Sequence, residues 1–150
     1  YFAKDAKYKL GTAQVVSDQI DGSDKSVAIA VAGSLLPYAL TAQKTLKEKG
    51  VGSVVINTGI VNKPDVKTIA PYLGKTKGFL ATLEDHRVDG GMGSYLTHSL
   101  LREGIELKNL VSLGVDEHFG RSSYQADHLY KVYGLDDTAL VDKIMAKFKQ

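Results

Sequence analysis

The hydrophobic positions of the chain form short apolar runs that alternate with segments of helical periodicity. The runs have the length and β-branched composition of strands. We expect strands at residues 8–16, 27–31, 51–57, 78–83 and 107–115. Between and after them, apolar residues recur every three or four positions, which predicts helices. These helices are expected to begin near Ser34, Pro64, Gly91 or Gly93, Ala126 and Asp136.

Several of these helix ends carry residues that are favoured at the N- or C-terminus of a helix. Ser34 is expected to be the N-cap of the first helix, and Asp136 that of the last. Gly50 is expected to follow the C-cap of the first helix, and Pro64 to occupy the first position of the second. In the third helix, the spacing predicts four inward-facing residues. They are Met92, Tyr95, Leu96 and Leu100.

The order of these elements is typical of a three-layer α/β/α domain with a five-stranded mixed sheet. Helical crossovers explain the connections after Val27 and make those strands parallel. The link from Val16 to Val27 is too short for a crossover, so the first strand should lie antiparallel to its neighbour. A length of 150 residues fits one domain over residues 1–150, and we interpret residues 1–7 as the remnant of a linker.

The segment 79–94, FLATLEDHRVDGGMGS, carries the most concentrated chemistry. An apolar strand ends in Glu84, Asp85 and His86, at the sheet edge where open α/β domains bind ligands or partners. Such a triplet is compatible with catalysis, but a solvated or hydrogen-bonded strand end is the more frequent case. The glycine-rich turn that follows either presents N–H groups to an anion at a helix N-terminus or allows close helix-to-strand packing. Its candidate residues are Gly90, Gly91, Gly93 and Ser94.

Arg121 is a further candidate, because its guanidinium could clamp a carboxylate or phosphate; pairing with Asp116 or Glu117 is the alternative. The tyrosines at 124, 130 and 133 suit an interface as well as ordinary helix packing. The four histidines lack the spacing of a zinc site. The residues therefore indicate no catalytic set, no cofactor-binding set and no metal site.

The composition bears on the classes of partner and on the compartment that we expect for the chain. Nineteen basic and seventeen acidic residues give a net charge of +2, and no basic stripe indicates nucleic-acid binding. No apolar run approaches the ~20 residues that cross a bilayer, so we expect no membrane span. The absence of cysteine fits the cytoplasm. The chain starts with Tyr1, which suggests that it was cut from a longer protein.

Taken together, the motifs resemble the C-terminal domain of transketolase. The resemblance covers nearly the whole chain and rests on the order and spacing of short motifs. They are YKLGTA at 8–13, VAGS at 31–34, ALTA at 39–42, EDH at 84–86, GGMG at 90–93, LGVD at 113–116, FGRS at 119–122 and LYKVYGLD at 129–136. The Gly-Gly-x-Gly-Ser turn is shared with 1-deoxyxylulose-5-phosphate synthase, which is the main rival.

The resemblance implies a five-stranded mixed sheet with an antiparallel first strand, in agreement with the pattern. It also implies a parent enzyme of the pentose phosphate pathway that moves two-carbon ketol units between sugar phosphates. That enzyme uses thiamine diphosphate with Mg²⁺ or Ca²⁺, bound by two other domains through a Gly-Asp-Gly motif and a glutamate. No Gly-Asp-Gly occurs here, so no catalytic residue is carried over.

The expected function is therefore a non-catalytic, dimer-supporting domain of a homodimeric transketolase, inactive when isolated. Its partner would be the remaining domains or subunit of that enzyme. Two alternatives remain open: the same domain of 1-deoxyxylulose-5-phosphate synthase, or a free-standing phosphate- or nucleotide-binding module.

Overall fold

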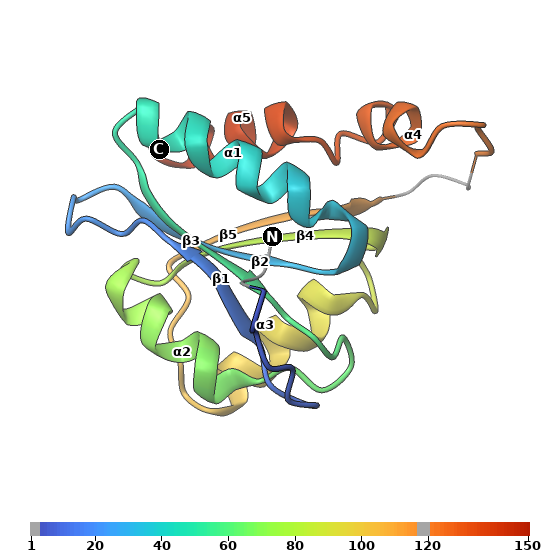
Figure 1. The fold of residues 1–150 in the computed structure, drawn as a ribbon. Coiled ribbons are helices and arrows are strands. Elements are labelled where there is room, and N and C mark those ends of the chain that lie inside the picture. Colours follow the sequence, from blue (N-terminus) through green and yellow to red (C-terminus); the bar gives the residue numbers. More distant parts are fainter. Residues whose placement is uncertain (1–3, 117–120) are drawn as a thin grey trace.

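Five strands form one mixed sheet in the order β1-β3-β2-β4-β5 (Figure 1). The computed structural model describes residues 4–116 and 121–150. The strands are β1 (Gln14–Asp18), β2 (Ser26–Val31), β3 (Gly52–Asn57), β4 (Phe79–Arg87) and β5 (Asn109–Val115). Strand β2 pairs in parallel with both β3 and β4, and β4 pairs in parallel with β5. This confirms the predicted α/β class and the five-stranded mixed sheet.

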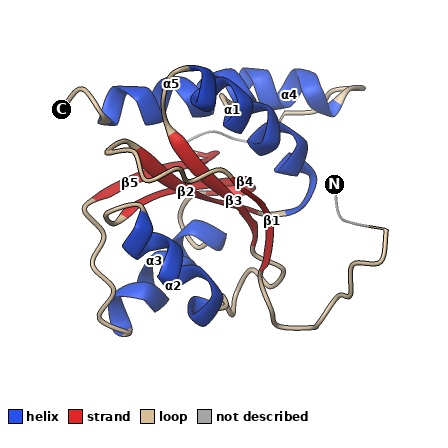
Figure 2. Ribbon diagram, turned by 60° about the vertical axis from the view of Figure 1, so that its left-hand side comes forward, coloured by secondary structure: helices blue, strands red, loops and turns tan. Residues whose placement is uncertain are grey.

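Helices cover both faces of the sheet, which makes three layers (Figure 2). A 3₁₀ turn, η1 (Gly33–Leu35), leads into α1 (Leu36–Glu48), which packs beside α5 (Asp137–Lys147) on one face. The opposite face carries α2 (Val66–Lys75) and α3 (Met92–Arg102). The short helix α4 (Ala126–Val132) lies on the side of α1 and α5.

The alternation of side chains along β2 builds two separate cores. Val27, Ile29 and Val31 belong to the core under α1 and α5, whereas Ala28 and Ala30 belong to the core over α2 and α3. All six residues of β2 are buried, as expected for a central parallel strand covered on both faces.

The antiparallel orientation of β1 is confirmed, and its partner is β3. The predicted start of this strand at Tyr8 is wrong: β1 begins at Gln14. Tyr8 and Leu10 are 59% and 77% exposed, and the N–H of Thr12 bonds to the carbonyl of Lys9 in a turn. Residues 4–12 therefore form an arm that leads to the sheet.

The predicted helix ends are confirmed where the cap is local. The carboxylate of Asp136 accepts the N–H of Ala139 at 2.9 Å, and Gly50 has the left-handed φ of +74° that suits a residue after a C-cap. Helix α2 begins at Val66 rather than Pro64, because Asp65 supplies its N-cap to the N–H of Thr68.

Two expectations about side-chain direction are wrong. Ser34 does not cap α1: it lies in η1, and its hydroxyl bonds to side chains elsewhere. Tyr95 does not face inward with its helix neighbours, because it is 43% exposed. Across the described part of the chain, every helix is too short or too polar to span a bilayer.

Candidate functional site

The carboxyl ends of β2 and β4 meet at the topological switch of the sheet. The chain leaves β2 through α1 toward β3, and it leaves the adjacent β4 through α3 toward β5. The two connections diverge over opposite faces, which is where open α/β sheets place ligands or partners. We call this region, made by residues 33–34, 84–94 and 126–130, the carboxyl edge.

Strand β4 continues through the polar triplet to Arg87, beyond its predicted end at Leu83. Because successive strand residues point to opposite faces, Glu84 and Asp85 serve different helical layers. Glu84 is 3% exposed. Its carboxylate accepts the N–H of Met92 at 2.5 Å and the N–H of Gly93 at 2.8 Å. Glu84 is thus a side-chain cap for α3.

Asp85 faces the other layer. The hydroxyl of Ser34 donates to its carboxylate at 2.7 Å, and the hydroxyl of Tyr130 donates to the same oxygen at 3.3 Å. The two hydroxyl oxygens are themselves 2.9 Å apart. We call this group of three residues the Asp85 clasp. It joins η1, the end of β4 and helix α4.

A second tyrosine–carboxylate pair lies beside the clasp. The hydroxyl of Tyr38 donates to Asp127 at 2.7 Å, and the rings of Tyr38 and Tyr130 meet edge to face at 5.6 Å between centroids. The hydrogen bond to Asp127 and, secondarily, burial raise the pKa of Tyr38 to about 12. Tyr38 therefore remains protonated and serves as a donor that holds α4 against α1.

The glycines of the following turn have two different roles. A Cβ at Gly91 would collide with the carbonyl of Arg87 and the carboxylate of Glu84, and one at Gly93 would lie 2.6 Å from Oγ1 of Thr82. Both positions need glycine for close packing. Gly90 has open space around it but a φ of +76°, so its requirement is conformational.

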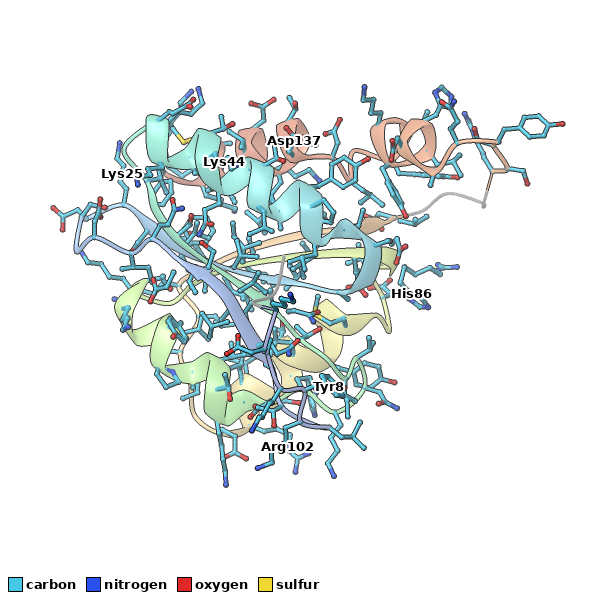
Figure 3. The ribbon with its side chains drawn as sticks, in the orientation of Figure 1. Tyr8, Lys25, Lys44, His86, Arg102 and Asp137 are labelled. Atoms are coloured by element: carbon cyan, nitrogen blue, oxygen red, sulfur yellow. The ribbon has the colours of Figure 1, made fainter. Side chains whose placement is uncertain are left out.

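The remaining predicted site residues lie in two different parts of the structure: Ser94 and His86 at the carboxyl edge, and Arg121 before α4. Ser94 closes the turn by donating to the carbonyl of Val88 at 2.7 Å and accepting the N–H of Gly90 at 3.2 Å. His86 is exposed and points away from the ribbon (Figure 3). Arg121 precedes α4, where its backbone N–H bonds to the hydroxyl of Tyr133. The cavity it lines contains no residue of the 90–94 turn, so the structure does not unite Arg121 with that turn.

Helix α4 is the element with the least internal support. It has no buried residue, and the groove beside it is lined by side chains with substantial apolar surface. Tyr124 is fully exposed and Val132 is 46% exposed. His118, Phe119 and Gly120, which belong to the motifs of the preceding loop, lie outside the described residues.

The hydroxyl groups of Ser34, Ser94 and Tyr130 and the N–H groups that begin α3 all donate within the chain. Among residues 4–116 and 121–150, no three His, Asp or Glu side chains gather where they could hold a metal ion. The two N–H groups at the start of α3 already bind Glu84, so a diphosphate there would have to displace a buried carboxylate. The described residues do not fit a thiamine diphosphate and metal site. What sequence reasoning missed is the cap itself, since no local spacing links Glu84 to α3.

The fold and this edge define a three-layer α/β/α domain whose switch point is closed by its own side chains. The family profile described as "Transketolase, C-terminal domain" matches residues 18–140, and the chain belongs to that family. A solved structure described as a split gene transketolase in an inactive beta4 tetramer superposes with a TM-score of 0.79 at 26% identity, over 97% of this chain and 44% of that one.

Curated relatives agree with the family. A protein of Methanocaldococcus jannaschii described as a transketolase C-terminal section is 31% identical over 98% of this chain and 43% of its own length. Transketolase of Rattus norvegicus is 29% identical over 95% of this chain and 22% of its own length. 1-Deoxy-D-xylulose-5-phosphate synthase 2 of Geobacter sulfurreducens is 31% identical over 93% of this chain and 21% of its own length. The chain spans less than half the length of these relatives.

Proposed function

We propose that the chain is the non-catalytic, dimer-supporting C-terminal domain of a transketolase. The complete enzyme would transfer two-carbon ketol units between sugar phosphates in the pentose phosphate pathway of the cytoplasm. The observation that carries the proposal is the difference between the share of this chain and the share of its relative that the match covers. Nearly all of this chain, 98%, matches a relative of which it spans only 43%. The rest of such an enzyme is where the chemistry would reside.

The carboxyl edge supports a non-catalytic role. Glu84, Asp85 and Ser34 would be the natural acid, base and nucleophile candidates, yet each is engaged in holding a helix in place. Thiamine diphosphate and its divalent metal would bind to other domains of the complete enzyme. The isolated chain should therefore show no calorimetric binding of thiamine diphosphate with Mg²⁺. A dissociation constant tighter than about 10⁻⁵ M would contradict this assignment.

The groove beside α4, whose lining includes Tyr124, Leu129 and Val132, supports the interface role. Helix α4 has no buried residue and is held by the Asp85 clasp and by Tyr38. Its Val132 and, just before the helix, Tyr124 are exposed. Burial of exposed aromatic and aliphatic side chains against a second subunit is favourable, and aromatic residues are enriched in the cores of such interfaces. We assign this surface to the homodimer. Val132→Lys should weaken dimerisation of the complete enzyme, whereas Leu101→Lys, at an exposed site on the opposite helical layer, should leave it unchanged.

A specific observation also favours a second candidate. The Geobacter sulfurreducens synthase matches as well as the rat transketolase, at 31% against 29% identity. The complete enzyme of the second candidate would be a 1-deoxyxylulose-5-phosphate synthase, with the same non-catalytic role for this domain. A free-standing phosphate-binding module receives no such support, because the N–H groups it would use hold Glu84.

The test is an activity assay of the enzyme with and without its catalytic region. The complete enzyme is given a ketose phosphate donor with ribose 5-phosphate and, separately, pyruvate as the donor. Ketol transfer to ribose 5-phosphate without pyruvate supports transketolase. Formation of deoxyxylulose phosphate that requires pyruvate assigns the synthase instead. Either activity in the 150-residue chain alone would refute the non-catalytic role.

A further inference from the structure

The N-terminus of α3 already contains an anion, and the anion belongs to the chain. Both carboxylate oxygens of Glu84 accept backbone N–H groups of the first helical turn, those of Met92 and Gly93. Glu84 is 3% exposed, and neither of the two ion pairs found among the described residues involves its carboxylate. The negative charge of the carboxylate is therefore stabilised by the peptide N–H groups and by the positive end of the helix dipole.

A second, independent observation points to an anion pocket at the same place. The hydroxyl of Thr82 is buried, and its oxygen has no hydrogen-bond partner within the described structure. It lies against Gly93: a Cβ built at Gly93 would be 2.6 Å from Oγ1 of Thr82 and 3.2 Å from Oε1 of Glu84. A spare hydroxyl donor thus stands beside the carboxylate. Buried polar groups of this kind normally have a partner. Glu84 does not supply one in this structure, so the hydroxyl is available to a free anion that replaces the Glu84 carboxylate.

The glycines give the pocket its shape. Only a residue without Cβ at positions 91 and 93 lets the helix start approach β4 closely enough for the N–H groups to reach Glu84. The turn is anchored separately by Ser94, which bonds to Val88 and Gly90 and not to Glu84. The N–H groups are consequently oriented by elements other than the carboxylate that they bind.

We propose that the start of α3 is a preformed carboxylate-binding site in which Glu84 is the resident ligand. Removal of the Glu84 side chain beyond Cβ would leave a space that matches acetate, because the atoms lost in Glu84→Ala are two carbons and two carboxylate oxygens. Acetate from solution then occupies the vacated site, bound by the N–H groups of Met92 and Gly93 and by the hydroxyl of Thr82. This inference does not depend on which enzyme the chain completes.

The experiment measures the melting temperature and the backbone amide spectrum of the Glu84→Ala chain during titration with sodium acetate. We expect a saturable rise in melting temperature, with amide shifts that concentrate at Met92 and Gly93. Sodium chloride at equal ionic strength and acetamide, the neutral isostere, should give neither effect. Asp85→Ala is the matched control: it removes the adjacent carboxylate on the opposite face of β4, which is exposed, and it should not respond to acetate.

A refolding measurement and a second variant allow the proposal to be tested even if Glu84→Ala does not fold. If Glu84→Ala does not fold in plain buffer, refolding is measured in acetate against chloride, and recovery in acetate alone supports the site. Glu84→Gln fills the same space with a neutral amide, so it should be less stable than the natural chain and insensitive to acetate. An equal response of Glu84→Ala to acetate and acetamide, shifts elsewhere in the spectrum, or no response in a folded variant would overturn the proposal.

Discussion

Replacing Gly93 by alanine should destabilise the domain, although alanine is the better helix former. Gly93 lies in the first turn of α3 without a left-handed φ, so the backbone itself accepts a side chain. The obstacle is space. The new Cβ would be 2.6 Å from Oγ1 of Thr82 and 3.2 Å from Oε1 of Glu84, where ordinary contacts are 3.4–4 Å.

The size of the effect follows from these two contacts. Overpacking of a close-packed site costs about 1–3 kcal/mol, and a hydrogen bond to a charged group contributes about 1.5–3 kcal/mol. If the methyl group strains the packing and breaks one of the two bonds to Glu84, these costs add to about 2.5–6 kcal/mol. Helix propensity returns about 1 kcal/mol, so the free energy of unfolding should fall by about 1.5–5 kcal/mol. Gly93→Val should cost more, because it adds β-branched bulk at the same point.

Gly74→Ala is the control. Gly74 lies inside α2, has no left-handed φ, and a Cβ there meets no atom within 4 Å. The same substitution should therefore stabilise the chain by roughly 0.5–1 kcal/mol through helix propensity. Urea unfolding at constant m-value measures both changes. A Gly93→Ala chain as stable as the natural one, or as stable as Gly74→Ala, would refute the close packing described for α3.

Three further outcomes are expected at the carboxyl edge. Asp127→Asn should move the pKa of Tyr38 from about 12 back toward 10.0, as followed by ultraviolet titration with Tyr38→Phe as the reference. Because the folded pKa is raised, the stabilisation from neutral Tyr38 is complete below pH 10.0 and should disappear as the pH rises through about 12. Tyr130→Phe should lower the free energy of unfolding by less than about 1 kcal/mol, since the Asp85 clasp is exposed, yet accelerate amide exchange in α4; unchanged exchange would show that the clasp does not hold the helix. Sulfate at tens of millimolar should leave the amides at the start of α3 unmoved in the natural chain, and a shift confined to them would restore the anion-binding hypothesis for the glycine turn.

The parts of the fold that could be predicted are those determined by nearby residues. The apolar runs of β2 and β3 are buried along almost their whole length, so their composition alone identifies them. The Asp136 cap is equally local, because its acceptor and the N–H of Ala139 are three residues apart. The strand–helix order then determines the parallel strands and the orientation of β1.

The parts that could not be predicted depend on contacts across the chain. Glu84 binds N–H groups eight and nine residues away, around a turn whose path the sequence does not show. Ser34 has the composition of an N-cap, but its partners are 51 and 96 residues distant, and they take the hydroxyl away from α1. The sequence places the polar triplet at the carboxyl end of a strand, but the division of its carboxylates between two helical layers depends on contacts that only the structure shows.

The most direct test of the central claim compares the complete enzyme with a version that ends before Tyr8. Sedimentation equilibrium gives the dimer dissociation constant, and ketol transfer is assayed on the same samples. An obligate dimer interface commonly buries about 2,000 Å² or more, so removal of this domain should weaken dimerisation and lower activity while leaving thiamine diphosphate binding in place. A truncated enzyme with an unchanged dissociation constant and unchanged activity would contradict the dimer-supporting role.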